Sequence, residues 1–407
     1  MRVQGRGRAG RRTGTALVTG AVAVVTALMT GLTTAPPTNA AAPGAEDLRR
    51  TLAADVREVR AAGGDVRVLA EVDTGRGVLR ARAGGGTVPT PWNARFRAAS
   101  TTKTFTAVVV LQLAAEGKLS LDDTVGKWLP GVVSGHGNDG SRITVRDLLQ
   151  QTSGLFDYVN DPGLARALAE HFEENRHDAT PAEKWVAVAM RHRPLFTPDH
   201  RHPRWAYSNT NYLLAGMIAE KAGGLAWREQ VEHRVIAPLG LRDTSVPGAN
   251  PYLPGPHARV TLRTPDGGRT DVTDHSLQHT ADSGLVTTTA DLNTFFRALA
   301  GGKLLPPDQL RAMQRTVDRS GATDDLAEWP EGGYGLGLRR TPLSCGSGYW
   351  HHEGDGLGSY TRTGVTPDGR RSVAVSVTSA GDTPDRVRFN KATRKLVDDA
   401  LCGAGTS

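Results

Sequence analysis

Segments with the pattern of β-strands lie at both ends of this 407-residue chain, while its long middle has few of them. Residues 66–72 and 77–83 predict two early strands around a Gly-rich turn. Residues 120–280 instead combine helical patterns with loops rich in Pro, Gly and His. This order predicts an α/β (α+β) fold, in which both termini build one mixed antiparallel sheet. The later strands are expected at 334–339, 349–352, 359–363 and 372–378.

Terminal helices are expected to flank this sheet. In residues 46–62 leucines and valines recur on one helical face, and residues 387–401 close the chain as a helix. Another apolar helix is expected over 101–116, ending at Gly117. The predicted boundaries are 41–119 and 281–407 for the sheet domain, and 120–280 for an inserted, mostly helical domain.

The first forty residues have the composition of a secretory signal peptide. Five arginines precede an uncharged apolar stretch at 15–32, and a Pro-rich segment then leads to Ala40, near which we expect cleavage. An uncleaved membrane anchor is the alternative, because the apolar stretch is close to the shortest length that spans a bilayer. The paired Arg11 and Arg12 also raise the twin-arginine export route. We expect a secreted or cell-wall-associated protein with no stable membrane anchor.

The excess of positive charge belongs to this leader. The formal net charge of +7 falls to +2 without its five arginines. Basicity is therefore no indication of nucleic-acid binding, and no basic stripe with interleaved aromatic residues follows.

The chain contains two cysteines, Cys345 and Cys402. An even pair in an exported chain favours one disulfide, and two free buried thiols are the alternative. A bond between them would close a long loop and stabilise the fold by roughly 4 kcal/mol.

Ser100-Thr101-Thr102-Lys103 stands at the head of an apolar run, and no other serine has a lysine three residues later. Residues i and i+3 share one face of a helix. A serine needs a base to become a nucleophile, and a partly desolvated amine near a helix N-terminus has a lowered pKa. Lys103 is therefore a candidate base for Ser100. The alternative is an N-cap serine followed by a solvated lysine.

Tyr207-Ser208-Asn209, before an apolar helix over 213–218, is a second candidate group. A phenol near two cations can ionise and carry a proton, and the amide of Asn209 can hold a substrate carbonyl. The alternative is an aromatic core residue beside an N-cap asparagine. Tyr158 begins a second Tyr-x-Asn triplet, but in an expected loop, so Tyr207 is preferred.

His352-Glu353-Gly354, on a late expected strand before Asp355, is the third candidate group. A hydrogen-bonding residue followed by glycine lets a substrate lie against the strand edge, whereas a merely buried or exposed histidine is the alternative. A zinc motif would need a second histidine at fixed spacing, which is missing. His200 and His202 lie in a Pro/Arg-rich loop and are expected to be solvated, so no metal site is expected.

The order of these three motifs resembles that of the penicillin-recognising serine hydrolases. This family includes class C β-lactamases, serine esterases, D-aminopeptidases and DD-peptidases; more familiar members carry Ser-Asp-Asn and Lys-Thr-Gly. The resemblance is strongest to secreted D-alanyl-D-alanine carboxypeptidase/transpeptidases with a His-x-Gly third motif. It extends over nearly the whole mature chain, including 105–119, 143–155, 207–217, 334–340 and 343–346. It implies a β-lactamase/DD-peptidase-like fold and a Cys345–Cys402 disulfide.

The resemblance also implies a role for each matched residue. Ser100 attacks the substrate carbonyl, and Lys103 and Tyr207 share the proton transfers. His352 lines the site and hydrogen-bonds toward Tyr207. Backbone N–H groups of Ser100 and Asp355 would form the oxyanion hole. No cofactor, metal or organic, is implied. The expected substrate-binding residues are Asn209, Arg339, Glu353, Gly354 and Asp355, with Arg339 gripping a terminal carboxylate.

The two acids of this set depart from the family pattern. Hydroxyl residues flank the motif glycine in the related carboxypeptidases, and acids beside an anion-binding site repel an anion. Either Arg339 pairs with one of the acids, or Glu353 points away from the cleft, since neighbours on a strand alternate faces.

We therefore expect a monomeric serine hydrolase that forms an acyl-enzyme. D-Ala-D-Ala carboxypeptidase activity on peptidoglycan stem peptides, with β-lactams as covalent inhibitors, is the leading expectation. The alternatives are an esterase, an amidase, a D-aminopeptidase, a β-lactamase, or a penicillin-binding module that barely turns over.

Overall fold

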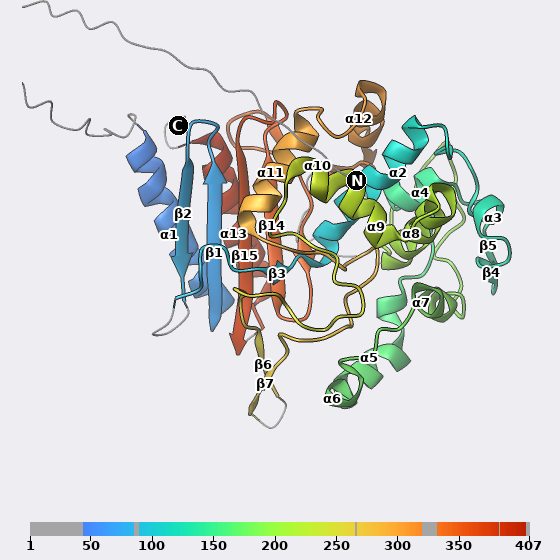
Figure 1. Ribbon diagram of the computed structural model, residues 1–407, viewed down its shortest axis with the longest axis horizontal. Coiled ribbons are helices and arrows are strands. Elements are labelled where there is room, and N and C mark those ends of the chain that lie inside the picture. The colour runs from blue at the N-terminus through green and yellow to red at the C-terminus, as the bar shows by residue number, and fades with distance from the viewer. Residues whose placement is uncertain (1–43, 85–88, 265–266, 320–331, 382, 404–407) are drawn as a thin grey trace, which may run out of the picture. The chain divides into compact units, whose positions relative to one another are not determined.

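A sheet assembled from both ends of the chain forms the centre of the fold (Figure 1). The computed structural model describes residues 44–84, 89–264, 267–319, 332–381 and 383–403. The main strands are β1 (Val66–Asp73), β2 (Val78–Ala83), β9 (Val317–Asp318), β10 (Gly333–Tyr334), β11 (Arg339–Pro342), β12 (Gly348–His351), β14 (Ser359–Val365) and β15 (Ser372–Gly381). They are hydrogen-bonded in the order β2-β1-β15-β14-β12-β11-β10-β9, with antiparallel neighbours.

The first and last parts of the chain meet in the middle of this sheet. Strand β1 pairs with β15 along its whole length, from Val66 opposite Ser379 to Asp73 opposite Ser372. Short strands complete the sheet: β13 (Gly354–Asp355) pairs with β14, β6 (Thr261–Arg263) pairs in parallel with β15, and β7 (Arg269–Asp271) pairs with β6. The predicted mixed antiparallel sheet is thus confirmed. Two separate strand pairs are β3 (Phe96–Arg97) with β8 (Val286–Thr287), and β4 (Ser134–Gly135) with β5 (Asn138–Asp139).

Helices cover both faces of the sheet. On one face, α1 (Ala45–Gly63) and α13 (Arg386–Cys402) pack on each other and on the strands, as their apolar periodicity predicts. On the other face, α11 (Thr289–Ala300) packs against β1, β14 and β15. Its buried residues belong to a second hydrophobic core, which lies on the side of the sheet that faces the helical region. Both terminal helices extend the predicted segments by one or two residues.

Helix α2 (Thr102–Ala115) is buried on nearly every side, in agreement with its apolar sequence. It packs against α8 (Asn209–Gly223) and α12 (Pro307–Gln314). The remaining helical elements are α3 (Val125–Trp128), α4 (Val145–Gln150), η2 (Tyr158–Asn160), α5 (Pro162–Glu170), α6 (Phe172–Asn175), α7 (Ala182–Ala189), α9 (Trp227–Val231), η3 (Glu232–Ile236) and α10 (Ala237–Leu239). The middle of the chain is mostly helical, although it also supplies β6 to the sheet. Residues 41–407 form one compact unit, and the two-domain boundaries stay a prediction.

The strand expected at 334–339 is wrong, because the chain turns inside it. The N–H of Gly335 donates to the carbonyl of Leu338 at 2.7 Å, which closes a tight turn between β10 and β11. Gly337 has φ +69°, and a Cβ there would lie 2.7 Å from Cβ of Ala107 on α2. The turn therefore requires glycine both for its conformation and for its contact with α2.

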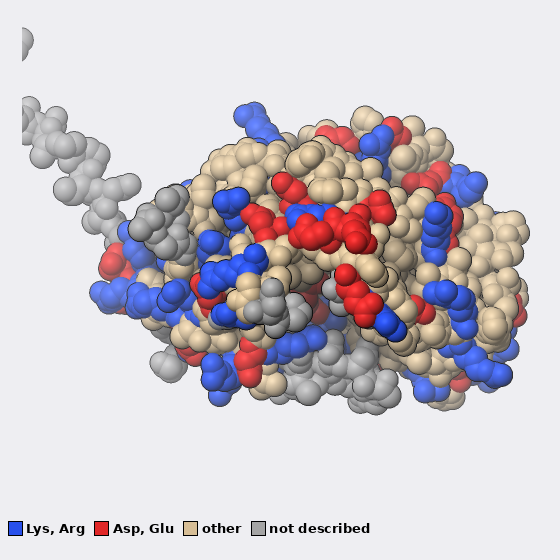
Figure 2. Space-filling model, turned by 90° about the horizontal axis from the view of Figure 1, so that it is seen from below, with Lys and Arg blue, Asp and Glu red and all other residues tan. Residues whose placement is uncertain are grey.

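Cys345 and Cys402 form a disulfide, with their Cα atoms 5.8 Å apart, so the last helix is covalently tied to the β11–β12 turn. No helix in the described ranges is long and apolar enough to span a membrane. The predicted signal peptide lies outside those ranges. On the face shown in Figure 2, acidic side chains gather near the centre, with Lys and Arg side chains toward both ends.

Candidate active site

Ser100 lies in a one-turn helix, η1 (Ala99–Thr101), that leads directly into α2. The preceding residue, Ala99, has φ +48°, a left-handed conformation that residues with a Cβ rarely adopt. Gly354 of β13 packs against this turn, because a Cβ at 354 would lie 2.0 Å from the carbonyl oxygen of Ala98. The space beside Gly354 is thus taken by the protein's own backbone, and strand β13 is held directly against the turn that carries Ser100.

Lys103 is fully buried one helical turn after Ser100. Its Nζ donates to Ser100 Oγ at 2.9 Å, to Asn209 Oδ1 at 2.6 Å and to the backbone carbonyl of Asp282 at 2.9 Å. The i, i+3 spacing therefore brings the two side chains together as predicted. The three bonds use all three donors of an ammonium group.

Burial lowers the pKa of Lys103 to about 8, although three nearby carboxylates oppose this shift. These are Asp282, Asp157 and Glu353, while Arg339 lowers the pKa further. About a tenth of Lys103 is therefore the neutral amine at pH 7, which is the form that can accept a proton.

Tyr207 precedes α8 and is hydrogen-bonded to the Ser100 side chain. Its ring centroid lies 5.1 Å from Lys103 Nζ and 5.9 Å from the Arg339 guanidinium carbon. The expected two cations are thus present, but burial raises the pKa of Tyr207 well above its ordinary value. The raised pKa favours the protonated phenol in the resting site, and an ionised Tyr207 stays a prediction.

Tyr158, the tyrosine of the other Tyr-x-Asn triplet, contacts Asp282, whose backbone carbonyl also binds Lys103. Its phenol is buried and donates to Asp282 Oδ2 at 3.1 Å, and its own backbone N–H donates to Thr210 Oγ1. Burial and two carboxylates raise the pKa of Tyr158 well above its ordinary value. Tyr158 supports the wall of the site, whereas Tyr207 touches Ser100.

His352 is fully buried and contacts Tyr334. Its Nδ1 lies 2.6 Å from the carbonyl oxygen of Glu353, which accepts only, so Nδ1 carries the proton. The other ring nitrogen, Nε2, then accepts from the Tyr334 phenol at 3.0 Å. Burial lowers the pKa of His352 to about 4, so the ring is neutral at neutral pH. Both ring nitrogens of His352 thus have partners, and the expected hydrogen bond toward Tyr207 stays a prediction.

Arg339 and Glu353 form an ion pair, with 2.8 Å between Arg339 Nη2 and Glu353 Oε1. Burial alone would raise the pKa of Glu353, but Arg339 and the neighbouring histidines hold it well below its ordinary value. The second acid, Asp355, pairs separately with Arg362 at 2.5 Å. Of the two sequence-based possibilities, pairing of Arg339 with an acid is confirmed, and Glu353 is the partner.

Sequence reasoning missed two acids and one phenol at the site. Asp157 accepts from Asn209 Nδ2 at 2.9 Å, the backbone of Asp282 accepts from Lys103, and Tyr334 holds His352. None belongs to a motif with a fixed spacing. The only available signal was that Asp157 immediately precedes the duplicated Tyr-x-Asn triplet.

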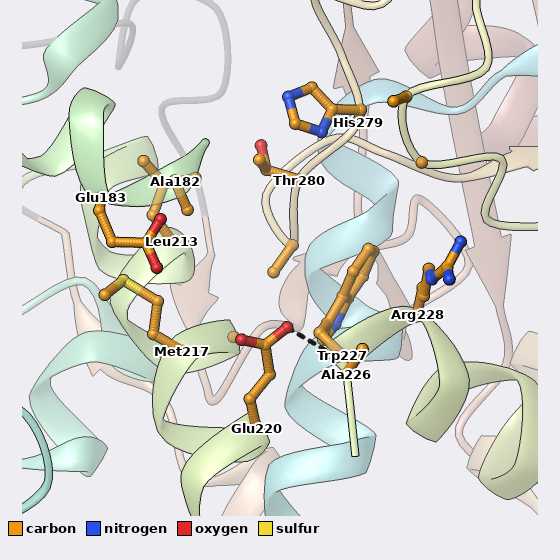
Figure 3. A pocket seen from close by; sticks show the side chains of 14 residues that line it. Ala182, Glu183, Leu213, Met217, Glu220, Ala226, Trp227, Arg228, His279 and Thr280 are labelled. Carbon is orange, nitrogen blue, oxygen red and sulfur yellow. Dashed lines mark hydrogen bonds between the residues drawn. The ribbon is translucent and has the colours of Figure 1, made fainter. Parts of the chain in front are cut away.

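A cavity of about 350 Å³ lies behind the Asp282 segment, between α7, α8 and α9 (Figure 3). Leu213, Met217 and Trp227 line it, and the carboxylates of Glu183 and Glu220 point into it. Ser100 and Lys103 do not line this cavity. Its importance for the site is structural, because Gly216 on its wall lets Ala281 pack tightly against α8.

Comparison with known proteins assigns the chain and its fold to a family. The family model described as Beta-lactamase matches residues 48–398. The chain belongs to the beta-lactamase family. This beta-lactamase-family protein is a serine hydrolase, and the β-lactamase/DD-peptidase fold expected from its sequence is confirmed.

Solved structures related to this beta-lactamase-family protein include two D-specific enzymes. A D-stereospecific amidohydrolase from a Streptomyces species is 39% identical, with a TM-score of 0.76, over 88% of this chain and 99% of that one. A D-amino acid amidase from Ochrobactrum anthropi SV3 is 24% identical, with a TM-score of 0.72, over 87% and 98% of the two chains, and shows the fold alone.

Curated relatives include a penicillin-binding protein and protein flp. Penicillin-binding protein 4* of Bacillus subtilis (strain 168) is 32% identical over 162 residues, which are 39% of this chain and 32% of the relative. The match to protein flp of Staphylococcus aureus covers 40% of that relative. The chain thus spans about a third to two fifths of the length of these relatives.

Proposed function

We propose that the protein hydrolyses amide bonds of D-configured acyl donors through an ester on Ser100. The observation that carries the proposal is the environment of Lys103. Two of its three partners, Asn209 Oδ1 and the Asp282 carbonyl, only accept hydrogen bonds. When Lys103 loses a proton, its two remaining N–H groups stay on these acceptors. The lone pair then faces Ser100 Oγ, 2.9 Å away.

The reaction follows from this arrangement. Ser100 Oγ attacks the acyl carbon while its proton passes to Lys103 Nζ, and the carbonyl electrons move to oxygen. Tyr207 delivers a proton to the leaving amine as the C–N bond breaks, and takes one back from Lys103. Water then attacks the ester, giving the free acid and regenerating Ser100. The backbone N–H groups of Ser100 and Asp355 are the proposed donors to the developing oxyanion.

The ion pair between Arg339 and Glu353 favours substrates without a free terminal carboxylate. Its guanidinium is already neutralised by Glu353 within a buried pair, so it offers little net charge to an anion. The 39%-identical relative is named a D-stereospecific amidohydrolase. We therefore place D-amino-acid amides and capped D-peptides first, with an esterase or D-aminopeptidase activity of the same site as variants of this proposal.

D-Ala-D-Ala carboxypeptidase activity on peptidoglycan stem peptides is the second candidate. It is favoured by the presence of Arg339 near Tyr207 and by the similarity to penicillin-binding proteins. β-Lactams would then act as covalent inhibitors. A module that acylates without turnover belongs to the same candidate. The Cys345–Cys402 disulfide is compatible with the proposed export to an oxidising compartment.

The deciding experiment combines hydrolysis with mass spectrometry. We expect release of ammonia from a D-amino-acid amide that exceeds release of D-Ala from an acyl-D-Ala-D-Ala peptide, and a penicillin adduct on the intact protein. The Ser100→Ala variant should lose both turnover and the adduct. An adduct on Ser100→Ala would exclude Ser100 as the nucleophile, and faster cleavage of the free-acid peptide would select the carboxypeptidase.

A further inference from the structure

Asp157 is buried immediately before the η2 turn, behind Asn209. Its Oδ2 accepts from Asn209 Nδ2 at 2.9 Å, while Asn209 Oδ1 accepts from Lys103 Nζ at 2.6 Å. Lys103 in turn contacts Ser100. A carboxylate, an amide, an amine and a hydroxyl thus form one hydrogen-bonded chain, whose first member has no role in the mechanism above.

An ionised carboxylate can only accept hydrogen bonds. Burial raises the pKa of Asp157 to about 6, against the hydrogen bond from Asn209 and the charge of Lys103, so the group is ionised at pH 7. Asn209 must therefore present its NH₂ group to Asp157 and its oxygen to Lys103. The reversed amide would set two acceptors against each other on one side and two donors on the other.

This orientation decides where the lone pair of neutral Lys103 points. With Asn209 Oδ1 and the Asp282 carbonyl as acceptors, the amine keeps its two N–H groups on them and turns its lone pair to Ser100. A reversed Asn209 would offer N–H donors to the same lone pair. The amine would then be occupied by the amide instead of the serine hydroxyl.

We propose that Asp157 is a positioning residue for acyl transfer, which fixes the Asn209 amide so that neutral Lys103 directs its lone pair at Ser100. The inference rests on the proposed Ser100–Lys103 chemistry and deepens it. Asp157 acts through Asn209 and does not itself touch the substrate.

The charges around Lys103 give this role a measurable signature. Asp157, Asp282 and Glu353 favour the ammonium form, Arg339 opposes it, and the rings of Tyr207 and Tyr212 lie 5.1 and 5.6 Å from Nζ. Removing the charge of Asp157 alone therefore favours the neutral amine. The rise of acylation with pH, which follows deprotonation of Lys103, should move to lower pH by about one unit.

The test is the pH dependence of Ser100 acylation in the Asp157→Asn variant. Acylation is measured as a single-turnover reaction with a chromogenic β-lactam. Asparagine keeps the size of the side chain but can donate as well as accept, so Asn209 loses its fixed orientation. We expect the plateau rate constant to fall about tenfold or more, on the scale of a mispositioned base, and the rising limb to shift to lower pH. The matched control is Asp161→Asn. Asp161 is a buried acid in the same segment that caps α5 and contacts His192, so its loss should change neither quantity.

Asp157 also caps the η2 turn, and a purely structural role of this kind predicts a different outcome. The proposal is overturned if Asp157→Asn lowers the melting temperature but leaves the pH dependence of acylation unchanged. It is also overturned if Asp161→Asn shifts the pH dependence of acylation as Asp157→Asn does. Should Asp157→Asn fail to fold, Asp157→Ser also removes the charge and carries the same expectation. An adduct on Ser100→Ala would refute the proposed function itself, which separates that failure from a failure of this inference.

Discussion

Arg339 and Glu353 face each other across the end of the sheet as a buried ion pair, with 2.8 Å between Nη2 and Oε1. Arg339 lies on β11 opposite His351 of β12, and Glu353 follows β12 by two residues. Because the pair is nearly dry, a third charged group, such as a substrate carboxylate, competes directly with Glu353 for the arginine.

Glu353→Gln should therefore change substrate preference. The variant frees the Arg339 charge, and we expect kcat/KM for an acyl-D-Ala-D-Ala free acid to rise relative to its terminal amide by about tenfold, which corresponds to ~1.4 kcal/mol. The ratio of the two substrates is measured in one preparation, so partial unfolding cancels. Asp355→Asn is the control, because Asp355 pairs with Arg362. Equal changes on both substrates would show that Glu353 does not set specificity.

The two Tyr-x-Asn triplets make a ranked prediction. Tyr207→Phe should lower the acylation rate by at least ~10²-fold, since it removes the phenol that contacts Ser100 and that would deliver a proton to the leaving amine. Tyr158→Phe should act mainly on stability, by ~1–3 kcal/mol, because Asp282 loses a buried hydrogen-bond donor. Pre-steady-state acylation and urea unfolding measure the two effects. The opposite ranking would reverse the assignment of the tyrosines.

Gly216 connects helix packing to Lys103. A Cβ at this position would lie 2.4 Å from Cβ of Ala281, which directly precedes the residue whose carbonyl accepts from Lys103. Gly216→Ala should displace that segment, destabilise the fold by ~1–3 kcal/mol and slow acylation. The double variant Gly216→Ala/Ala281→Gly restores the space and should recover both. Recovery of stability without recovery of acylation would show that the segment does not position Lys103.

Buried histidines predict loss of stability in acid. Burial lowers the pKa of His275 to about 2, of His351 to about 3 and of His352 to about 4. Unfolded histidine titrates near 6.5, so between pH 6.5 and 4 the unfolded state binds more protons and stability falls as pH falls. The raised pKa of Asp157 opposes this in part.

We expect the free energy of unfolding in urea to be lower at pH 5 than at pH 7, with each such histidine contributing about 1.4 kcal/mol per pH unit. His275→Asn removes one titrating group outside the active site and should make the pH dependence shallower. A variant with the same slope as the wild type would contradict the assignment of this effect to buried histidines.

Helices whose apolar residues recur with helical spacing could be predicted from the sequence. The apolar faces of α1 and α13 and the all-round apolar sequence of α2 are periodic features, and each predicted helix is present. The i, i+3 spacing of Ser100 and Lys103 also fixed their contact in advance, since a helix sets that geometry.

Contacts between segments that are far apart in sequence could not be predicted from such patterns. The partner of His352 is Tyr334, because a glycine turn places β10 beside the imidazole, and the composition of that segment predicts a continuous strand instead. Asp157 contacts Asn209 and Asp282 contacts Lys103, from loops separated by more than a hundred residues in sequence. Their identity as site residues follows only once the fold brings the loops together.

The pairing of β1 with β15 also sets a temporal order on folding. Val66 finds its partner at Ser379, so the edge of β1 that faces β15 stays unpaired until nearly all of the polypeptide has been synthesised. Strand β2 can pair with the other edge of β1 early, because it follows directly in sequence. Until β15 is made, the β1–β2 hairpin exposes the backbone donors and acceptors of its open edge. Such distant pairing makes folding slow and late, so the central sheet is completed only after its last strand has emerged.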